Sequence, residues 1–140
     1  MDKKPVLFSH NVQVRFSDID RYQHVNTVYY PDYVFTSRFD FIKKRFGLPH
    51  DHFERLGMAF YTIRSDITYR RGIPATMGEV RVDSSVADIS RNVIKIQFKI
   101  MDPSNELVFS NGTFEFMMMD LKTLKPMEAV PGEVLQVVFE

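Results

Sequence analysis

Three side chains of different chemistry stand within seven residues of one another near the start of the chain. They are the carboxylate of Asp20, the imidazole of His24 and the carboxamide of Asn26. A carboxylate in such a group could serve as a general base or as a nucleophile. An alternating, strand-like pattern precedes them and a mostly apolar, helix-like stretch follows, so we expect them in a loop. Loops held by buried elements often carry functional residues, but a turn that only caps the helix explains these residues equally well.

Two other pairs of residues could bind a ligand. His50 and His52 could hold a metal, but few acids stand near them, so a solvated loop without a metal is the better interpretation. Arg70 and Arg71 form a basic doublet in a loop with Gly and Pro, where a phosphate could dock. The nucleophile elbow, the P-loop and the dinucleotide-binding glycine motif do not occur. We therefore expect neither a metal nor a cofactor.

Composition limits the class of protein. A chain of 140 residues predicts one domain over residues 1–140, and 44% hydrophobic residues predict a compact core. The 18 basic and 18 acidic residues cancel, which argues against a nucleic-acid partner. The absence of cysteine excludes disulfides, thiolate catalysis and zinc–thiolate sites. No apolar run is long enough for a signal peptide or a membrane span, so we expect a cytoplasmic protein without a membrane partner.

A strand and a long helix must position the Asp20 loop. Val12, Val14 and Phe16 alternate with polar residues, which predicts a short half-buried strand. A helix is predicted from about Tyr30 to Phe46, because Pro31 suits a first helical turn and Gly47 suits the position after the last one. Apolar side chains cover most of the circumference of this helix, which predicts that it is enclosed.

The rest of the chain, from about Met58, has the pattern of strands. The predicted features are an apolar strand face at Tyr61, Ile63, Ile67 and Tyr69, alternation over Ile94–Ile100, a turn at Asp102–Asn105, a strand over Leu107–Met119 with Gly112 at a bulge or close approach, and a final strand over Val134–Phe139. One helix with several long antiparallel strands is an α+β domain. Since one helix cannot shield both faces of such a sheet, we expect a solvated face or a second copy of the chain.

The Asp20 segment also resembles a known family. Residues 15–26 read RFSDIDRYQHVN and are followed by Tyr30 and Arg38 in the helix, which is similar to the signature of hotdog-fold acyl-CoA thioesterases of the 4-hydroxybenzoyl-CoA thioesterase type. The resemblance extends over nearly the whole chain and implies a hotdog fold, in which a curved antiparallel sheet wraps a long central helix. It implies that Asp20 is the catalytic carboxylate and that His24 and Asn26 shape the pocket and order the loop. Tyr30, Arg70 and Arg71 are the expected substrate-binding residues.

Two positions depart from the family pattern. Thr27 stands where the closest branch has a second asparagine, and Phe35 replaces an acid that many members carry three residues before the helix arginine. The partner of Arg38 is therefore open: a carboxylate or a backbone carbonyl would satisfy it, and a side chain that reaches solvent is as good an explanation.

The resemblance implies hydrolysis of acyl-CoA thioesters to free acid and CoA. Two alternatives stay open from the sequence: a hotdog dehydratase or isomerase acting on acyl thioesters, and a non-catalytic module that binds acyl thioesters or fatty acids. The aromatic interior suits an aromatic or a bent alkyl acyl group, and the sequence does not choose between a general-base and a nucleophilic Asp20. The family further implies a homodimer, paired into a dimer of dimers, with the substrate between two chains.

Overall fold

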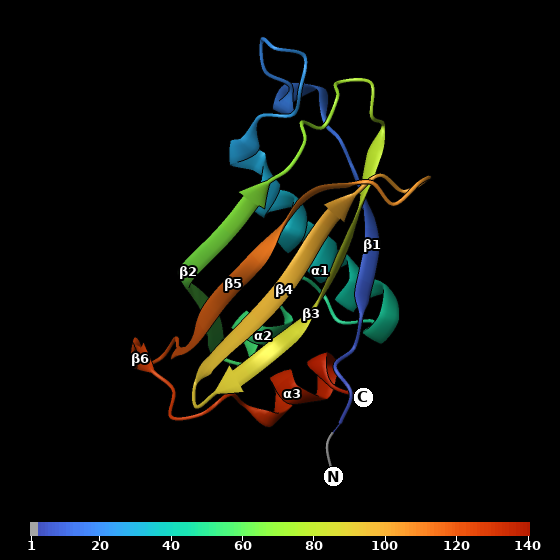
Figure 1. Ribbon diagram of the computed structural model, residues 1–140. Helices are drawn as coiled ribbons and strands as arrows, with labels where there is room; N and C mark the ends of the chain where they lie inside the picture. The colour runs from blue at the N-terminus through green and yellow to red at the C-terminus, as the bar shows by residue number, and fades with distance from the viewer. Residues whose placement is uncertain (1–2) are drawn as a thin grey trace.

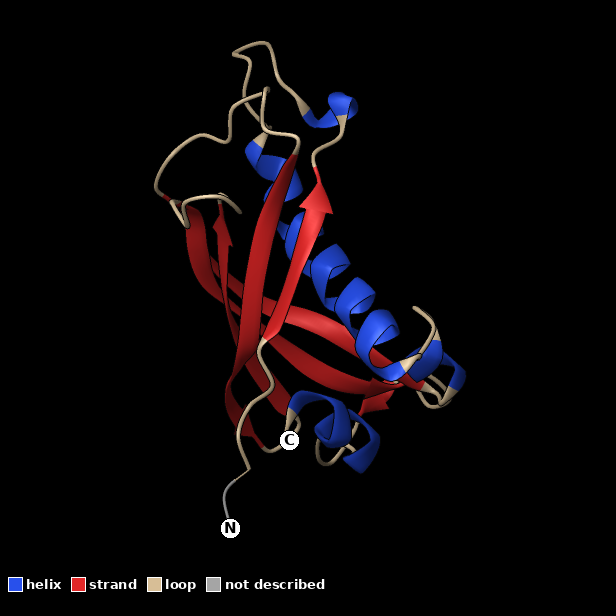
Figure 2. Cartoon of the chain, turned by 90° about the vertical axis from the view of Figure 1, so that its right-hand side faces the viewer, coloured by secondary structure: helices blue, strands red, loops and turns tan. Residues whose placement is uncertain are grey.

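The computed structural model describes residues 3–140, in which one antiparallel sheet curves around a long helix (Figures 1 and 2). The first two residues of the predicted domain 1–140 lie outside the described residues. The sheet contains five long strands in the order β1-β3-β4-β5-β2, with a short β6 beside β5. The elements are β1 Phe8–Gln13, η1 Phe16–Asp18, η2 Thr27–Tyr29, α1 Tyr30–Phe46, α2 His52–Arg55, β2 Met58–Tyr69, β3 Glu79–Ser90, β4 Val93–Met101, β5 Val108–Asp120, β6 Lys125–Pro126 and α3 Gly132–Val138. This arrangement confirms the predicted α+β class and hotdog fold.

Helix α1 begins and ends at the predicted residues. Pro31 lies in its first turn, and Gly47 ends it with a left-handed φ of 71°, a conformation that suits glycine. The helix buries Tyr30, Tyr33 and Val34 against the sheet, each 1% exposed or less. Its lysines and its last arginine lie exposed in the final turn, where cations favour the helix dipole.

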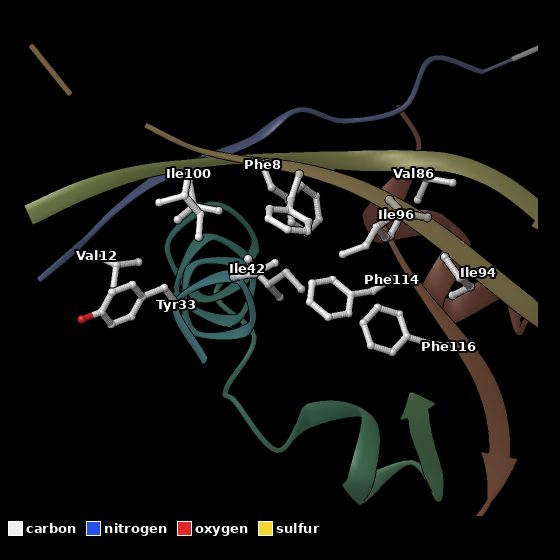
Figure 3. Close-up of a cluster of buried hydrophobic side chains, with 14 of the residues drawn as sticks. Phe8, Val12, Tyr33, Ile42, Val86, Ile94, Ile96, Ile100, Phe114 and Phe116 are labelled. Carbon is white, nitrogen blue, oxygen red and sulfur yellow. The ribbon is translucent and has the colours of Figure 1, made fainter. Parts of the chain in front are cut away.

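The inner face of the sheet is apolar at alternate positions. Ile94, Ile96, Phe98 and Ile100 of β4 are all buried, as the alternation predicts. Figure 3 shows several of these side chains packed with Phe114 and Phe116 of β5 beside α1. The turn at Asp102–Asn105 joins β4 and β5 as predicted, and the Asp102 carboxylate accepts the Ser104 N–H at 2.8 Å.

Gly112 lies where β5 meets β2 at very short range. A Cβ atom at this position would stand 1.9 Å from the carbonyl oxygen of Asp66, far inside contact distance. The residue therefore allows a close backbone approach, one of the two predicted explanations.

The first strand differs from the prediction. β1 covers Phe8–Gln13, and its buried residues are Phe8 and Val12. Phe16 belongs to the short turn η1 and is 96% exposed, so it is not a core residue of a strand. The chain leaves the sheet after Gln13 and runs through η1 and the Asp20 loop to the start of α1.

Strand β2 has no single apolar face, in contrast to the prediction. A bulge between Thr62 and Arg64 leaves Ile63 without a partner on β5 and reverses the alternation. Before the bulge, Phe60 and Thr62 point inward to a cavity; after it, Tyr69 packs on Tyr30 of α1 with ring centroids 5.4 Å apart. Tyr61 and Ile63 are 50% and 51% exposed, and β2 forms one edge of the sheet.

The last predicted strand is a helix. Val134, Val137 and Val138 of α3 are buried, a spacing of three and four residues that places them on one helical face. The residues at the end of α3 are hydrogen-bonded to the start of the chain. The Val6 N–H donates to the Val138 carbonyl at 2.9 Å, and the Glu140 N–H donates to the Lys4 carbonyl at 2.9 Å.

Within residues 3–140, no helix is long and apolar enough to cross a membrane.

Candidate active site

The Asp20 loop is organised around the carboxylate of Asp20 itself. Its Oδ1 accepts the backbone N–H groups of Tyr22 at 2.8 Å and His24 at 3.3 Å. The Asp20 N–H donates in turn to the His24 carbonyl at 2.8 Å, which closes the turn. Over residues 3–140, all hydrogen bonds to this carboxylate go to Oδ1. The loop therefore fixes the orientation of the carboxylate and leaves Oδ2 open in the sense that no described residue donates a hydrogen bond to it.

The ring of His24 is exposed but held on two sides. Its Nδ1 lies 2.9 Å from the Tyr22 carbonyl, which only accepts, so Nδ1 carries the proton of this hydrogen bond. Cδ2 packs on Gly72, where a Cβ atom would stand only 2.6 Å away. Nε2 is the ring nitrogen that remains for a ligand or for water.

Asn26 orders the start of α1. Its side-chain oxygen accepts the Val28 N–H at 3.1 Å, as an N-cap does, and its own N–H donates to the Asp18 carbonyl at 2.8 Å. The N–H groups of Tyr29 and Tyr30 bond back to Asn26 and Thr27 within the same turn. The Thr27 N–H stands at the first position of η2, where a backbone N–H has no intrahelical acceptor, and it donates to no other group among the described residues.

Tyr30, at the first position of α1, joins the loop to a second segment. Burial raises the pKa of Tyr30, a hydrogen bond with the backbone of Ile73 lowers it, and the nearby Tyr69 and Asp20 raise it further. The phenol therefore stays protonated at neutral pH and lies within electrostatic range of the Asp20 carboxylate.

The Asp20 loop is fastened to residues 73–75, which follow β2. The Val25 N–H donates to the Ile73 carbonyl at 2.9 Å, and the Ala75 N–H donates to the Gln23 carbonyl at 2.9 Å. Arg70 and Arg71 immediately precede this segment, and both are exposed. The Nε of Arg70 donates to the side-chain oxygen of Asn111 on β5, whereas Arg71 stands next to the glycine that touches His24.

The other acid of the loop, Asp18, has a different environment. It is 2% exposed, and one of its oxygens, Oδ2, accepts the Tyr33 hydroxyl at 2.7 Å and the Arg15 Nε–H at 2.8 Å. Burial and the hydrogen bond to Asp18 raise the pKa of Tyr33. Asp18 therefore ties η1 to α1, while Asp20 keeps one oxygen open.

Arg38 has neither of its two expected kinds of partner. Its Nη1 donates to the Ser84 hydroxyl of β3 at 2.9 Å, and its guanidinium carbon lies 4.5 Å from the centre of the Phe8 ring. Burial lowers the pKa of Arg38 to about 10. The side chain is held between β1 and β3, and the residue as a whole is partly exposed.

Arg38 also lines an apolar cavity of about 150 Å³ between α1 and the sheet. The cavity is lined by Phe35, Arg38, Phe39, Ile42, Phe53, Phe60, Thr62, Ile94, Ile96, Phe116, Val134, Val137 and Val138. Figure 3 shows four of them, Ile42, Ile94, Ile96 and Phe116, in the core between α1 and the sheet. None of the six predicted site residues belongs to this lining.

His50 and His52 do not converge on a metal site. The Nε2 of His50 lies 3.0 Å from Asp40 of α1, and the His52 ring packs edge-on against Phe53. Among residues 3–140, no three histidine or acidic side chains are arranged to hold a metal ion.

The structure thus brings Asp20, His24, Asn26 and Tyr30 together beside the segment that carries Arg71. A fixed carboxylate with an open oxygen, next to a neutral phenol and an exposed imidazole, can activate water or attack a carbonyl. Sequence reasoning missed Tyr69 and Gly72, which complete this arrangement. The close spacing of Gly72 to the arginine doublet was the available signal, but its contact with His24 depends on the tertiary fold.

Two comparisons with known sequences point in one direction. The model of the thioesterase-like superfamily matches residues 14–138. The long-chain acyl-CoA thioesterase FadM of Escherichia coli K12 is 27% identical over 128 residues, which cover 88% of this chain and 90% of FadM.

Solved structures share the fold. The probable thioesterase YbaW of Escherichia coli superposes with a TM-score of 0.78 at 23% identity, covering 94% of this chain and 98% of YbaW. The DHNA-CoA thioesterase of Staphylococcus aureus gives a TM-score of 0.75 at 18% identity, over 87% of this chain and 80% of that protein. SAV2348 of Staphylococcus aureus was solved in complex with CoA. It gives a TM-score of 0.77 at 19% identity, over 97% of this chain and 82% of SAV2348.

Proposed function

The chain belongs to the thioesterase-like superfamily and is a thioester hydrolase, and we propose that it hydrolyses acyl-CoA thioesters with Asp20 as the catalytic carboxylate. The observation that carries the proposal is the asymmetry of Asp20, whose Oδ1 is held by two backbone N–H groups while Oδ2 is open. The acyl-CoA substrate is supported by the similarity to FadM and by the CoA complex of SAV2348.

In the proposed reaction, Asp20 acts on the thioester carbonyl. Its Oδ2 removes a proton from an attacking water, or attacks the carbonyl itself to form an anhydride that water then hydrolyses. The C–S bond breaks, and the CoA thiolate leaves; thiols have a pKa of roughly 8.5, so strong acid catalysis is unnecessary. In this proposal the Thr27 N–H, at the start of η2, donates to the developing oxyanion; it donates to no other group among the described residues.

The supporting residues have separate roles in this proposal. Asn26 keeps the turn before α1 in place through its bond to the Val28 N–H. His24 holds the loop through the Tyr22 carbonyl and, with Tyr30, borders the reacting carbonyl. Arg70 and Arg71 are exposed cations at the rim, suited to the phosphates of CoA.

Replacement of Asp20 by asparagine tests the assignment. Asp20→Asn keeps the shape of the side chain and its hydrogen bonds to the loop, but it removes the base or nucleophile. We expect release of free thiol from acyl-CoA to fall by at least about a hundredfold, with an unchanged circular dichroism spectrum. His24→Ala should reduce the release of free thiol by less than Asp20→Asn does. A pure, folded Asp20→Asn protein with near-normal turnover would disprove the assignment.

We further propose that the active unit is a homodimer joined through β2. This strand is 12 residues long, forms an edge of the sheet and exposes most of its side chains. A long, free edge with exposed apolar residues is a template for pairing with another strand. The C-terminal end of β2 leads into Arg70 and Arg71, so a second chain along this edge would lie next to the Asp20 loop. Pairing of two such dimers stays a prediction.

A further inference from the structure

Arg38 is a cation in an apolar environment that contains no matching acid. Among residues 3–140 it forms no ion pair, and its hydrogen-bond partner is the neutral hydroxyl of Ser84. Its lowered pKa, about 10, reflects burial and still leaves it charged at neutral pH. An arginine fork has five N–H donors, and one hydroxyl and one aromatic ring satisfy only part of them.

The cavity beside Arg38 has room for a ligand. Its volume of about 150 Å³ is similar to that of an engineered protein cavity that binds benzene, so it suits a body of about six carbons. Apart from Arg38 and Thr62, the lining consists of aliphatic and aromatic side chains from α1, α2, α3, β2, β4 and β5.

A second hollow shares part of its lining with this cavity. It has a volume of about 160 Å³ and shares Phe39, Phe53 and Phe60 with the cavity. Its other side is formed by exposed residues, among them His50, Glu54 and Tyr61. We therefore take the entry of a ligand to lie between α2 and β2, past these three phenylalanine side chains.

We propose that this cavity binds a free monocarboxylic acid with an apolar body of about six carbons, whose carboxylate pairs with Arg38. The apolar lining takes the body of the acid, and Arg38 supplies the charge that the chain itself leaves unmatched. The acid is a free one, because a thioester has no negative charge to pair with Arg38, and no residue of the Asp20 loop lines the cavity. Binding does not depend on hydrolysis, so this site and the proposed function succeed or fail separately.

The test compares acids with their neutral amides on the complete protein. Hexanoate and benzoate are titrated against hexanamide and benzamide, and methyl NMR signals report the position of the ligand. We expect shifts at Ile94, Ile96 and Val137, and an affinity for each acid at least about tenfold higher than for its amide. This comparison needs no variant, so it holds even if a variant fails to fold. Equal affinities, or shifts away from these residues, would overturn the proposal.

Arg38→Met is the matching variant, since it keeps an unbranched side chain and removes the charge. We expect the preference for the acid to disappear while the weak binding of the amide stays. Arg45→Met, an exposed arginine in the last turn of the same helix, serves as the control and should leave both affinities unchanged. Acid binding that is as tight in Arg38→Met as in the unmodified protein would contradict the role of the guanidinium.

Discussion

At the scale of single residues, two acids only two positions apart have different environments. Asp18 is buried and accepts two hydrogen bonds on one oxygen, whereas Asp20 is only partly buried and keeps one oxygen open. Sequence alone presents both as aspartates of the same loop. The family resemblance implies Asp20, and the Oδ2 that accepts no hydrogen bond from residues 3–140 supports that proposal.

Asp18→Ala should therefore affect stability and not the chemical step. The variant leaves the Tyr33 hydroxyl buried without its acceptor, so we expect the free energy of unfolding to fall by about 2–3 kcal/mol in urea titrations. In the double variant Asp18→Ala/Tyr33→Phe, the loss should be smaller, because no buried hydroxyl remains unpaired. A stable Asp18→Ala protein without activity would instead make Asp18 the catalytic acid.

The contact between Gly72 and His24 predicts a second effect at this scale. In Gly72→Ala, the new methyl group would lie 2.6 Å from the ring carbon Cδ2, so the imidazole has to move. We expect kcat to fall about as far as in His24→Ala, and the double variant to be no worse than His24→Ala alone. Gly78→Ala, where no atom lies within 4 Å of the added group, is the control. Additive losses in the double variant would mean that the contact is irrelevant.

At the scale of elements, the close approach of β5 to β2 limits what Gly112 can become. In Gly112→Ala, the methyl group would meet the Asp66 carbonyl at 1.9 Å, and a backbone atom cannot turn aside as a side chain can. We expect the free energy of unfolding to fall by at least about 2 kcal/mol. Gly132→Ala, at the start of α3, has open space around the added group and should leave the thermal midpoint nearly unchanged. A normal midpoint for Gly112→Ala would show that the two strands can separate freely.

The sequence predicts some of these elements well and others poorly, for physical reasons. Helix α1 carries its own boundary signals in Pro31 and Gly47, and β4 has an uninterrupted alternation. The bulge at Ile63 is invisible in the sequence, because apolar residues on both sides of it happen to share one parity. The helical spacing of Val134, Val137 and Val138 was present, but a run rich in valine also favours a strand.

The candidate site shows a similar division. Residue types and spacing single out Asp20, His24 and Asn26, because these lie close together in the sequence. The hydrogen bonds that hold their side chains are local too, but the loop as a whole is fastened by residues about fifty positions away, in the segment Tyr69–Ala75. The cavity beside Arg38 draws on six elements, so no local pattern could predict it.

At the scale of the whole molecule, the proposed dimer brings two copies together along β2. Ile63→Lys places a charge on the exposed edge strand, and charged residues on an edge oppose strand pairing. We expect sedimentation at micromolar concentration to show dimers for the unmodified protein and monomers for Ile63→Lys, with lower activity. Leu124→Lys, at a leucine that is more exposed than Ile63 and lies in the turn after β5, should stay dimeric. An unmodified protein that is fully active as a monomer would place the whole site within one chain.

The contact between the two ends of the described chain bears on where the protein can be tagged or permuted. Pro5 pairs with Phe139, and both ends lie at the pole opposite the Asp20 loop (Figures 1 and 2). A fluorescent or affinity tag at either end would therefore stand clear of the loop. Ends this close also suit circular permutation, with a short peptide across the ends and a new start in the exposed turn at residues 121–124. We expect a chain with its strands in this permuted order to reach the same fold.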